Sequence, residues 1–191
     1  MASEKVKASI ECLKTCGGGK MVIHSGLAEV RSGQKASVLS SSTERLQALS
    51  GYVDKMGVEI ARENSPPHAL GSTVEEVERI LSRLSAYPVS FCLDTGHANL
   101  VAGGIQSFIV PGLKPAEVHI SDNLGEQDDH LPPGAGAIDW QKILAELYSC
   151  FGAELEGLAF TFELGGFPGG RAFHELKRWW ETLMRQAREG A

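Results

Sequence analysis

Short apolar runs alternate along the chain with longer stretches in which apolar residues recur at helical spacing. Each run has the length of one buried strand, and each intervening stretch can hold a helix. The runs cover residues 21–24, 58–64, 89–97, 118–123 and 158–163. Because strands that alternate with helices form βα units around a parallel sheet, the pattern predicts an α/β fold.

Helix signals fall between these runs. Val6, Ile10 and Leu13 share one face of a helix expected over residues 3–16. Further helices are expected to begin at the capping boxes 41–44 and 72–75 and at Asp139, and one to span residues 171–188. A polar loop over residues 122–138, rich in Gly and Pro, is too long for a plain connector, and such loops are usually functional.

Carboxylates and histidines stand at or just past the carboxyl end of every apolar run. The carboxyl ends of parallel strands meet at one edge of a barrel, where active sites are built. Singly, such a residue is usually explained by a salt bridge or by packing. Five consecutive strand ends with such groups predict a divalent-metal site, because buried charge is costly unless it is paired or metal-bound. The candidate set is His24, Glu63, Asp94, His97, His119 and Glu163, with Asp128 and His130 from the long loop.

Two local motifs bring pairs of these residues together. In the sequence Asp-Thr-Gly-His, Asp94 is expected to end a strand, and Gly96 to allow a sharp turn that returns His97 over the same site. In an extended loop, alternate residues point the same way, so Asp128 and His130 could reach one metal while Asp129 faces water. A simple solvated acidic pair at 128–129 is the alternative.

Charge and cysteine content narrow the function classes. The net charge of −6 argues weakly against a nucleic-acid partner, since part of the negative charge lies in the predicted site itself. No apolar run is long enough for a membrane helix, and the first residues lack the apolar core of a secretory signal. The four cysteines are scattered without a CxxC pair. Free thiols in a reducing, cytoplasmic location are therefore expected.

Three segments resemble a known family: CLDTGHAN at 92–99, HISDNLGEQDDHLPPGAGAIDW at 119–140 and FTFE at 160–163. They are similar to the xylose isomerase-like TIM barrel superfamily. That superfamily includes sugar and sugar-phosphate isomerases and epimerases, and abasic-site nucleases of the endonuclease IV type (AP endonuclease family 2). The resemblance implies an eight-stranded TIM barrel with metal ions at its C-terminal face.

The resemblance also implies roles for individual residues. It makes the core metal ligands Glu63, Asp94, His119 and Glu163. His97 becomes a substrate contact or a second-metal ligand, and the remaining candidates His24, Asp128 and His130 are ligands in members that hold two or three metals. The implied cofactor is a divalent metal ion: Mn, Zn, Mg or Co.

The chain departs from the family pattern in two places. Ala135 stands where the family usually has Glu between two glycines, so one loop carboxylate is absent. The resemblance begins near the helix that precedes the third barrel strand, so residues 1–191 are expected to form a single partial TIM-barrel domain of about six βα units. The open barrel would then need cover from a homo-oligomer or a partner chain. A truncated gene product and a decayed enzyme are the other readings.

The function implied is a divalent-metal-dependent isomerase or epimerase that acts on a small sugar or sugar phosphate. Glu63 and Glu163 would remove and return a proton through a metal-stabilised enediolate, in an order left open, and His97 would hydrogen-bond the substrate. An endonuclease IV-like zinc phosphodiesterase acting on abasic DNA, or a non-catalytic metal-binding remnant, is the alternative. Metal content separates them, because one Mn²⁺-like ion favours the isomerase and two or three Zn²⁺ favour the nuclease.

Overall fold

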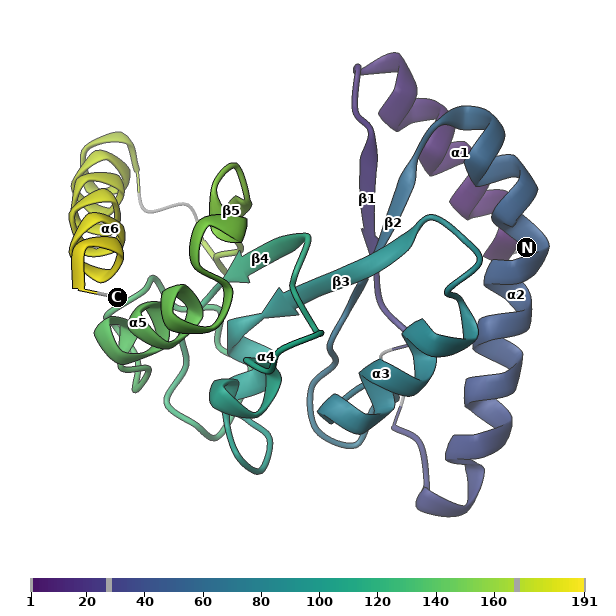
Figure 1. Ribbon diagram of the computed structural model, residues 1–191, viewed down its shortest axis with the longest axis horizontal. Coiled ribbons are helices and arrows are strands. Elements are labelled where there is room, and N and C mark those ends of the chain that lie inside the picture. The colour runs from purple at the N-terminus through teal and green to yellow at the C-terminus, as the bar shows by residue number, and fades with distance from the viewer. Residues whose placement is uncertain (1, 27–28, 167–168, 191) are drawn as a thin grey trace. The chain divides into compact units, whose positions relative to one another are not determined.

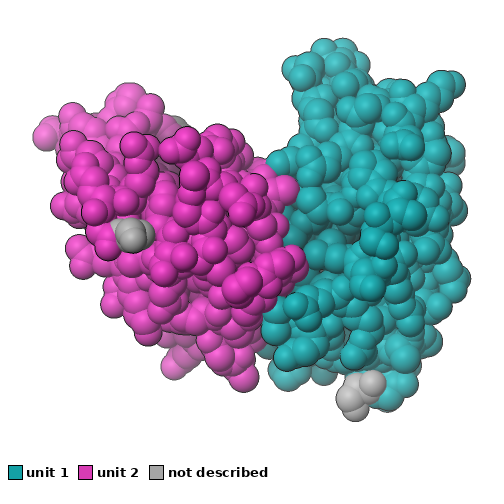
Figure 2. Space-filling view, in the orientation of Figure 1, with its two compact units in different colours: residues 1–92 teal, residues 93–191 magenta. Residues whose placement is uncertain are grey.

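The computed structural model describes residues 2–26, 29–166 and 169–190. They fall into two compact units, residues 1–92 and residues 93–191, which Figure 2 shows in different colours. The strands are β1 (Lys20–Ile23), β2 (Glu59–Glu63), β3 (Val89–Asp94), β4 (Glu117–Ile120) and β5 (Ala159–Phe162). The helices are α1 (Ala2–Thr15), α2 (Lys35–Met56), α3 (Val74–Arg83), α4 (Thr95–Asn99), α5 (Trp140–Phe151) and α6 (Gly170–Gly190). Short 3-10 turns cover Ser32–Gln34, Ile105–Phe108 and Gly152–Leu155.

The first unit is a parallel β-layer covered by helices. Strand β2 lies between β1 and β3 and pairs in parallel with both, with Ile23 opposite Arg62 and Glu63 opposite Cys92. Figure 1 shows α1 and α2 side by side next to β1 and β2. Apolar side chains fill the space between helices and strands: Ile10, Leu49, Val53, Val58 and Ile60. Burying the apolar faces of these helices is the main stabilising term.

Two helix ends in this unit follow local sequence signals. The Thr73 side chain accepts a hydrogen bond from the Glu76 N–H and caps the N-terminus of α3, one residue after Ser72, the cap that the box at 72–75 predicts. Gly57 ends α2 in the left-handed conformation with φ of 58°, which glycine adopts without steric cost.

The predicted start of α2 is wrong. The helix begins at Lys35, so the capping box at 41–44 lies inside it. The hydroxyl of Thr43 donates to the Leu39 carbonyl oxygen at 2.9 Å, a bond that a residue within a helix makes. Leu39 is buried against Leu70 and Ile80. This packing extends the helix toward its N-terminus, past the capping signal.

The second unit pairs β4 with β5 in parallel, with Val118 opposite Phe160. Helices α5 and α6 lie side by side in this unit (Figure 1). Trp180 of α6 packs edge-on against Trp140 of α5, with ring centroids 5.3 Å apart, and against Phe162 of β5 at 5.6 Å. The side chain of Asp139 accepts from the Lys142 N–H and caps α5, as predicted.

The arrangement confirms the α/β class. The described ranges contain five strands, against about six βα units expected, and β1–β2, β2–β3 and β4–β5 all pair in parallel. Strand β3 passes from the first unit into the second. A single domain over the whole chain stays a prediction. Within the described ranges, no helix combines the length and the apolar character that a membrane span requires.

The N-cap of α3 provides a test of the first unit. Thr73→Ala removes the side-chain acceptor for the Glu76 N–H and should lower the free energy of unfolding by about 1 kcal/mol. Thr73→Ser keeps the hydroxyl and should stay close to the parent chain. Denaturant unfolding of the three proteins measures both. Equal losses in the two variants would contradict the capping role.

Candidate functional site

Asp94 is the last residue of β3 and is fully buried. Its Oδ1 accepts a hydrogen bond from the His97 N–H at 2.6 Å, and the His97 Nδ1 lies 3.5 Å from the same oxygen. One carboxylate oxygen therefore fixes both the start of α4 and the imidazole of His97.

Glycine at position 96 serves a different purpose from the predicted sharp turn. A Cβ at this position would clash with the hydroxyl of Ser121, at the end of β4. The Asn123 side-chain amide donates to the Gly96 carbonyl oxygen at 2.8 Å, and Thr95 donates to the Ser121 carbonyl oxygen at 2.9 Å. The absence of a side chain lets α4 sit against β4, so the expected turn role is corrected to a close approach.

Three predicted core ligands meet in the second unit. One ligand atom each from Asp94, His119 and Glu163 lies within 4.8 Å of those of the other two. His119 lies on β4, and its Nδ1 is 2.8 Å from Glu163 Oε2, just past the end of β5. The hydrogen bond from His119 lowers the pKa of Glu163, so this carboxylate is ionised at neutral pH.

A second group combines His97 with the long loop. Asp128 Oδ2 lies 3.1 Å from His97 Nε2 and 3.2 Å from His130 Nε2. The hydrogen bond with His97 lowers the pKa of Asp128. Burial lowers the pKa of His130, but the hydrogen bond to the Glu163 carbonyl oxygen and the charge of Asp128 outweigh it, so the pKa is raised.

The backbone of the loop departs from the extended conformation that was expected around residues 128–130. His130 has φ of 48°, in the left-handed region that few residues other than glycine adopt. Its ring still reaches Asp128 on the same side, while Asp129 is exposed as predicted. The two side chains meet because the backbone turns at His130.

Sequence reasoning missed Asp122, which organises this loop. Its fully buried carboxylate accepts hydrogen bonds from four donors. They are the backbone N–H groups of Asn123, Gly134 and Ile138 and the indole N–H of Trp140. Asp122 also exchanges two backbone hydrogen bonds with Leu131. An Asp directly after an apolar run, facing a Gly-rich loop, was the available signal.

The remaining two candidates lie in the first unit. His24 Nε2 is 3.2 Å from Glu63 Oε2, and the Glu63 side chain is almost completely buried at the end of β2. Every candidate ligand therefore lies close to at least one other candidate ligand of the same unit. His68 and His174, which lie away from the strand ends, are both exposed.

The donor set fits a divalent metal ion. Asp94 and Glu163 place two carboxylates beside one imidazole within 4.8 Å, and two like charges so close are stable only with a proton or a cation between them. Imidazole and carboxylate ligands suit Zn²⁺ and Mn²⁺, while an all-carboxylate site would favour Mg²⁺. The ligand roles themselves stay predictions.

Comparison with known proteins identifies the family. The sequence matches the xylose isomerase-like TIM barrel family over residues 2–183. The chain belongs to this family. It is 28% identical over 155 residues to the uncharacterized protein MJ1311 of Methanocaldococcus jannaschii, covering 74% of this chain and 53% of the relative. The uncharacterized protein y4fM of Sinorhizobium fredii is also 28% identical, over 73% of this chain and 46% of its own length. The chain thus spans about half the length of these curated relatives.

Solved structures share the fold of this chain. A D-tagatose 3-epimerase-like protein superposes with a TM-score of 0.78 at 23% identity, covering 98% of this chain and 70% of its own. The IOLI protein with a bound zinc atom gives 0.78 at 24% identity, over 96% and 69%. An L-ribulose 3-epimerase gives 0.77 at 16%, over 98% and 68%. The predicted TIM-barrel class is confirmed, with this chain forming part of the barrel.

Removing the Asp122 carboxylate should release the loop. Asp122→Ala leaves four donors without their acceptor, and the three in buried hydrogen bonds, from Asn123, Ile138 and Trp140, cost about 1–3 kcal/mol each if none finds another partner. We expect a fall in melting temperature and faster hydrogen exchange at residues 131–138. Asp129→Ala, at an exposed loop position, is the matched control. Unchanged exchange in the Asp122 variant would contradict the anchoring role.

Proposed function

We propose that this chain carries the metal-binding half of a divalent-metal-dependent isomerase or epimerase acting on a sugar or sugar phosphate. The group of Asp94, His119 and Glu163 supports this most directly, because their ligand atoms lie within 4.8 Å of one another. Asp94 ends β3, His119 lies on β4 and Glu163 directly follows β5. Their location at the carboxyl ends of parallel strands is where TIM-barrel enzymes build active sites.

The substrate class comes from the family. Solved neighbours include an L-ribulose 3-epimerase and a D-tagatose 3-epimerase-like protein. Such epimerases are named for ketoses, in which the carbon next to a carbonyl can lose a proton. The proposal extends this chemistry to the present chain, and the IOLI neighbour with its zinc atom supports a divalent ion in the site.

In this proposal Asp94, His119 and Glu163 would hold the ion, with Glu63 as the fourth ligand that the family resemblance implies. A bound divalent cation would supply positive charge that stabilises the negative charge developing on the substrate oxygen as the neighbouring carbon loses its proton. The Asp94 carboxylate is oriented by its hydrogen bond from the His97 N–H at 2.6 Å, and His119 is oriented by Glu163 at 2.8 Å.

Proton transfer falls to the two glutamates. One of Glu63 and Glu163 removes the proton from the substrate carbon and the other returns one, which is general acid–base catalysis. Glu163 is ionised at neutral pH because the hydrogen bond from His119 lowers its pKa. The proposal assigns to His97, which lies between Asp94 and Asp128, the hydrogen bond to a substrate hydroxyl.

A zinc phosphodiesterase of the endonuclease IV type is the second candidate. The group of His97, Asp128 and His130 favours it, because these three offer a further set of ligand atoms within 4.8 Å of one another. A cluster of several zinc ions could activate water against a phosphate. The net charge of −6 weighs against a DNA substrate. A non-catalytic metal-binding remnant is the third reading.

Metal content tests the site and separates the candidates. Elemental analysis and native mass spectrometry of the purified chain should give one ion per chain for the isomerase and two or three zinc ions for the nuclease. EDTA should lower the melting temperature, because an ion that binds only the folded state at 100 times its dissociation constant adds about 2.7 kcal/mol.

His119→Ala should reduce metal content, whereas His174→Ala, at an exposed position on α6, should leave it unchanged. The chain could instead be free of metal, with a melting temperature that neither EDTA nor added Zn²⁺ or Mn²⁺ changes. That result would contradict a metal site in this chain.

Glu163→Gln tests the proton transfer. The substitution keeps the shape but removes the basic oxygen, so exchange of substrate carbon-bound hydrogen with D₂O should fall by about 10²–10⁴-fold. NMR of ketose substrates such as ribulose and tagatose, with and without phosphate, measures the exchange. Glu175→Gln on the exposed side of α6 is the control. Full exchange activity in the Glu163 variant would overturn the mechanism.

A further inference from the structure

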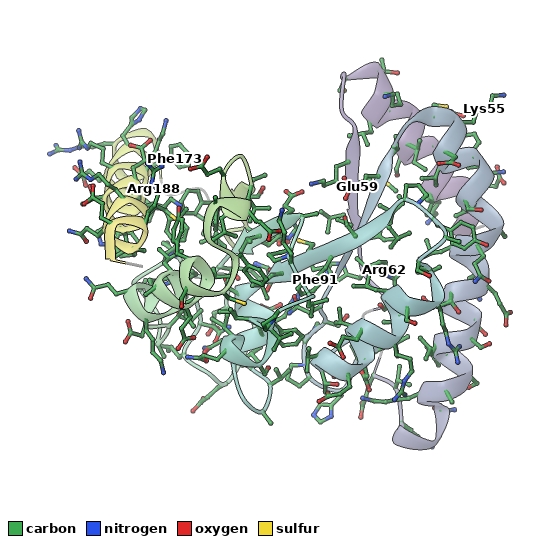
Figure 3. The ribbon with its side chains drawn as sticks, in the orientation of Figure 1. Lys55, Glu59, Arg62, Phe91, Phe173 and Arg188 are labelled. Carbon is green, nitrogen blue, oxygen red and sulfur yellow. The ribbon has the colours of Figure 1, made fainter. Side chains whose placement is uncertain are left out.

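Arg62 is a buried cation in the first unit, separate from the proposed metal ligands. It precedes Glu63 on β2, and successive strand residues point to opposite faces, so the two side chains leave the strand in opposite directions. Arg62, labelled in Figure 3, is only 4% exposed. Its Nη2 donates to the hydroxyl of Ser25, beyond β1, and to the hydroxyl of Ser42, on α2, at 3.3 Å.

Arg62 has no acidic counterpart in the part of the chain that the structure describes. Its side-chain hydrogen bonds there go to two neutral serine hydroxyls, and its buried Nε makes no hydrogen bond. Burial lowers the pKa of Arg62 to about 10. A buried charge is costly unless it is paired. A buried guanidinium with an N–H group that lacks an acceptor would therefore be stabilised by a bound anion.

The Arg62 side chain lines a cavity of about 890 Å³ between the end of β1 and the helices α1 and α2. Ser25, Ser41 and Ser42 add hydroxyl groups to its wall, and the exposed Arg45 lies at its edge. Apolar side chains form the rest of the lining, among them Ile23, Val38, Leu46 and Leu49. The cavity is large enough for a small phosphorylated molecule.

The charges that line this cavity favour an anion. Arg62 and Arg45 contribute two positive charges. The acidic side chain in the lining, Glu4, is itself paired with Lys7, whose Nζ lies 3.4 Å from Glu4 Oε1. The cavity therefore carries positive charge although the whole chain has a net charge of −6.

We propose that this cavity is a binding site for a phosphate-type oxyanion, held by the guanidinium of Arg62, the hydroxyls of Ser25 and Ser42, and Arg45. The planar fork of a guanidinium matches two phosphate oxygens, and hydroxyl donors can satisfy a third. Two sources share this chemistry: free inorganic phosphate and the phosphate group of a small metabolite. His24, which also lines the cavity, pairs with Glu63, so an occupant would lie one side chain away from that carboxylate.

Isothermal titration of the full chain with inorganic phosphate tests the site, with chloride at the same ionic strength as the reference. We expect saturable binding at one site per chain. Arg62→Gln and Ser42→Ala should each weaken phosphate binding, Arg62→Gln by at least about tenfold, because a charge-assisted hydrogen bond is lost. Arg83→Gln, at the exposed end of α3 and outside the cavity, is the control and should bind as the parent chain does.

If Arg62→Gln changes the fold, melting temperatures measured with and without phosphate still test the proposal. Without phosphate, this variant should be as stable as the parent chain or more stable, because an unpaired buried charge is gone. Phosphate should raise the melting temperature of the parent chain and of Arg83→Gln, and to a smaller extent that of Ser42→Ala. Absence of saturable phosphate binding in the parent chain, or equal affinity in all four proteins, would overturn the proposal.

A second arm identifies the source of the oxyanion. A sugar phosphate that binds tighter than inorganic phosphate, with loss of that advantage on removal of the phosphate group, indicates a metabolite. Equal affinities indicate free phosphate. Both outcomes support the site. Metal content and hydrogen exchange at the sugar carbon, which test the proposed function, are measured independently of this titration.

Discussion

The loop that carries Asp128 and His130, two of the eight candidate ligands, depends on the buried carboxylate of Asp122. Four donors from positions 123 to 140 converge on its two oxygens, so one side chain replaces the regular hydrogen bonding that a long loop lacks. The backbone bonds between Asp122 and Leu131 then fix the residues just after His130. In the same loop, Asp128 Oδ2 lies 3.1 Å from His97 Nε2.

Carboxylates placed near one another give the site its chemistry. Asp94 and Glu163 approach the same imidazole, and Asp128 stands between two further histidines. Each arrangement places carboxylates beside imidazole nitrogens, and a divalent cation would stabilise such a concentration of negative charge. Both groups of ligands would be stabilised by a cation. The number of bound metal ions therefore distinguishes an isomerase, with one ion, from a phosphodiesterase, with two or three.

The period of a β-strand gives neighbouring residues different tasks. Glu63 and Arg62 are adjacent in sequence, yet the first pairs with His24 and the second turns toward α2 and its serines. Strand β2 thus presents an acidic group on one face and a basic group on the other. The same strand end contributes to the proposed metal site and to the proposed oxyanion cavity, without competition between their charges.

The sequence by itself determined the features that depend on neighbouring residues. Periodicity and contacts within a few positions account for the five strands and for the donor types at the strand ends. They also account for the cap at Asp139 and, to within one residue, for the cap at Thr73. Only the tertiary structure decided where α2 begins, why position 96 is glycine, how His130 turns toward Asp128 and that Arg62 is buried. Each of these outcomes rests on contacts between segments distant in the chain, whose energies a local pattern does not contain.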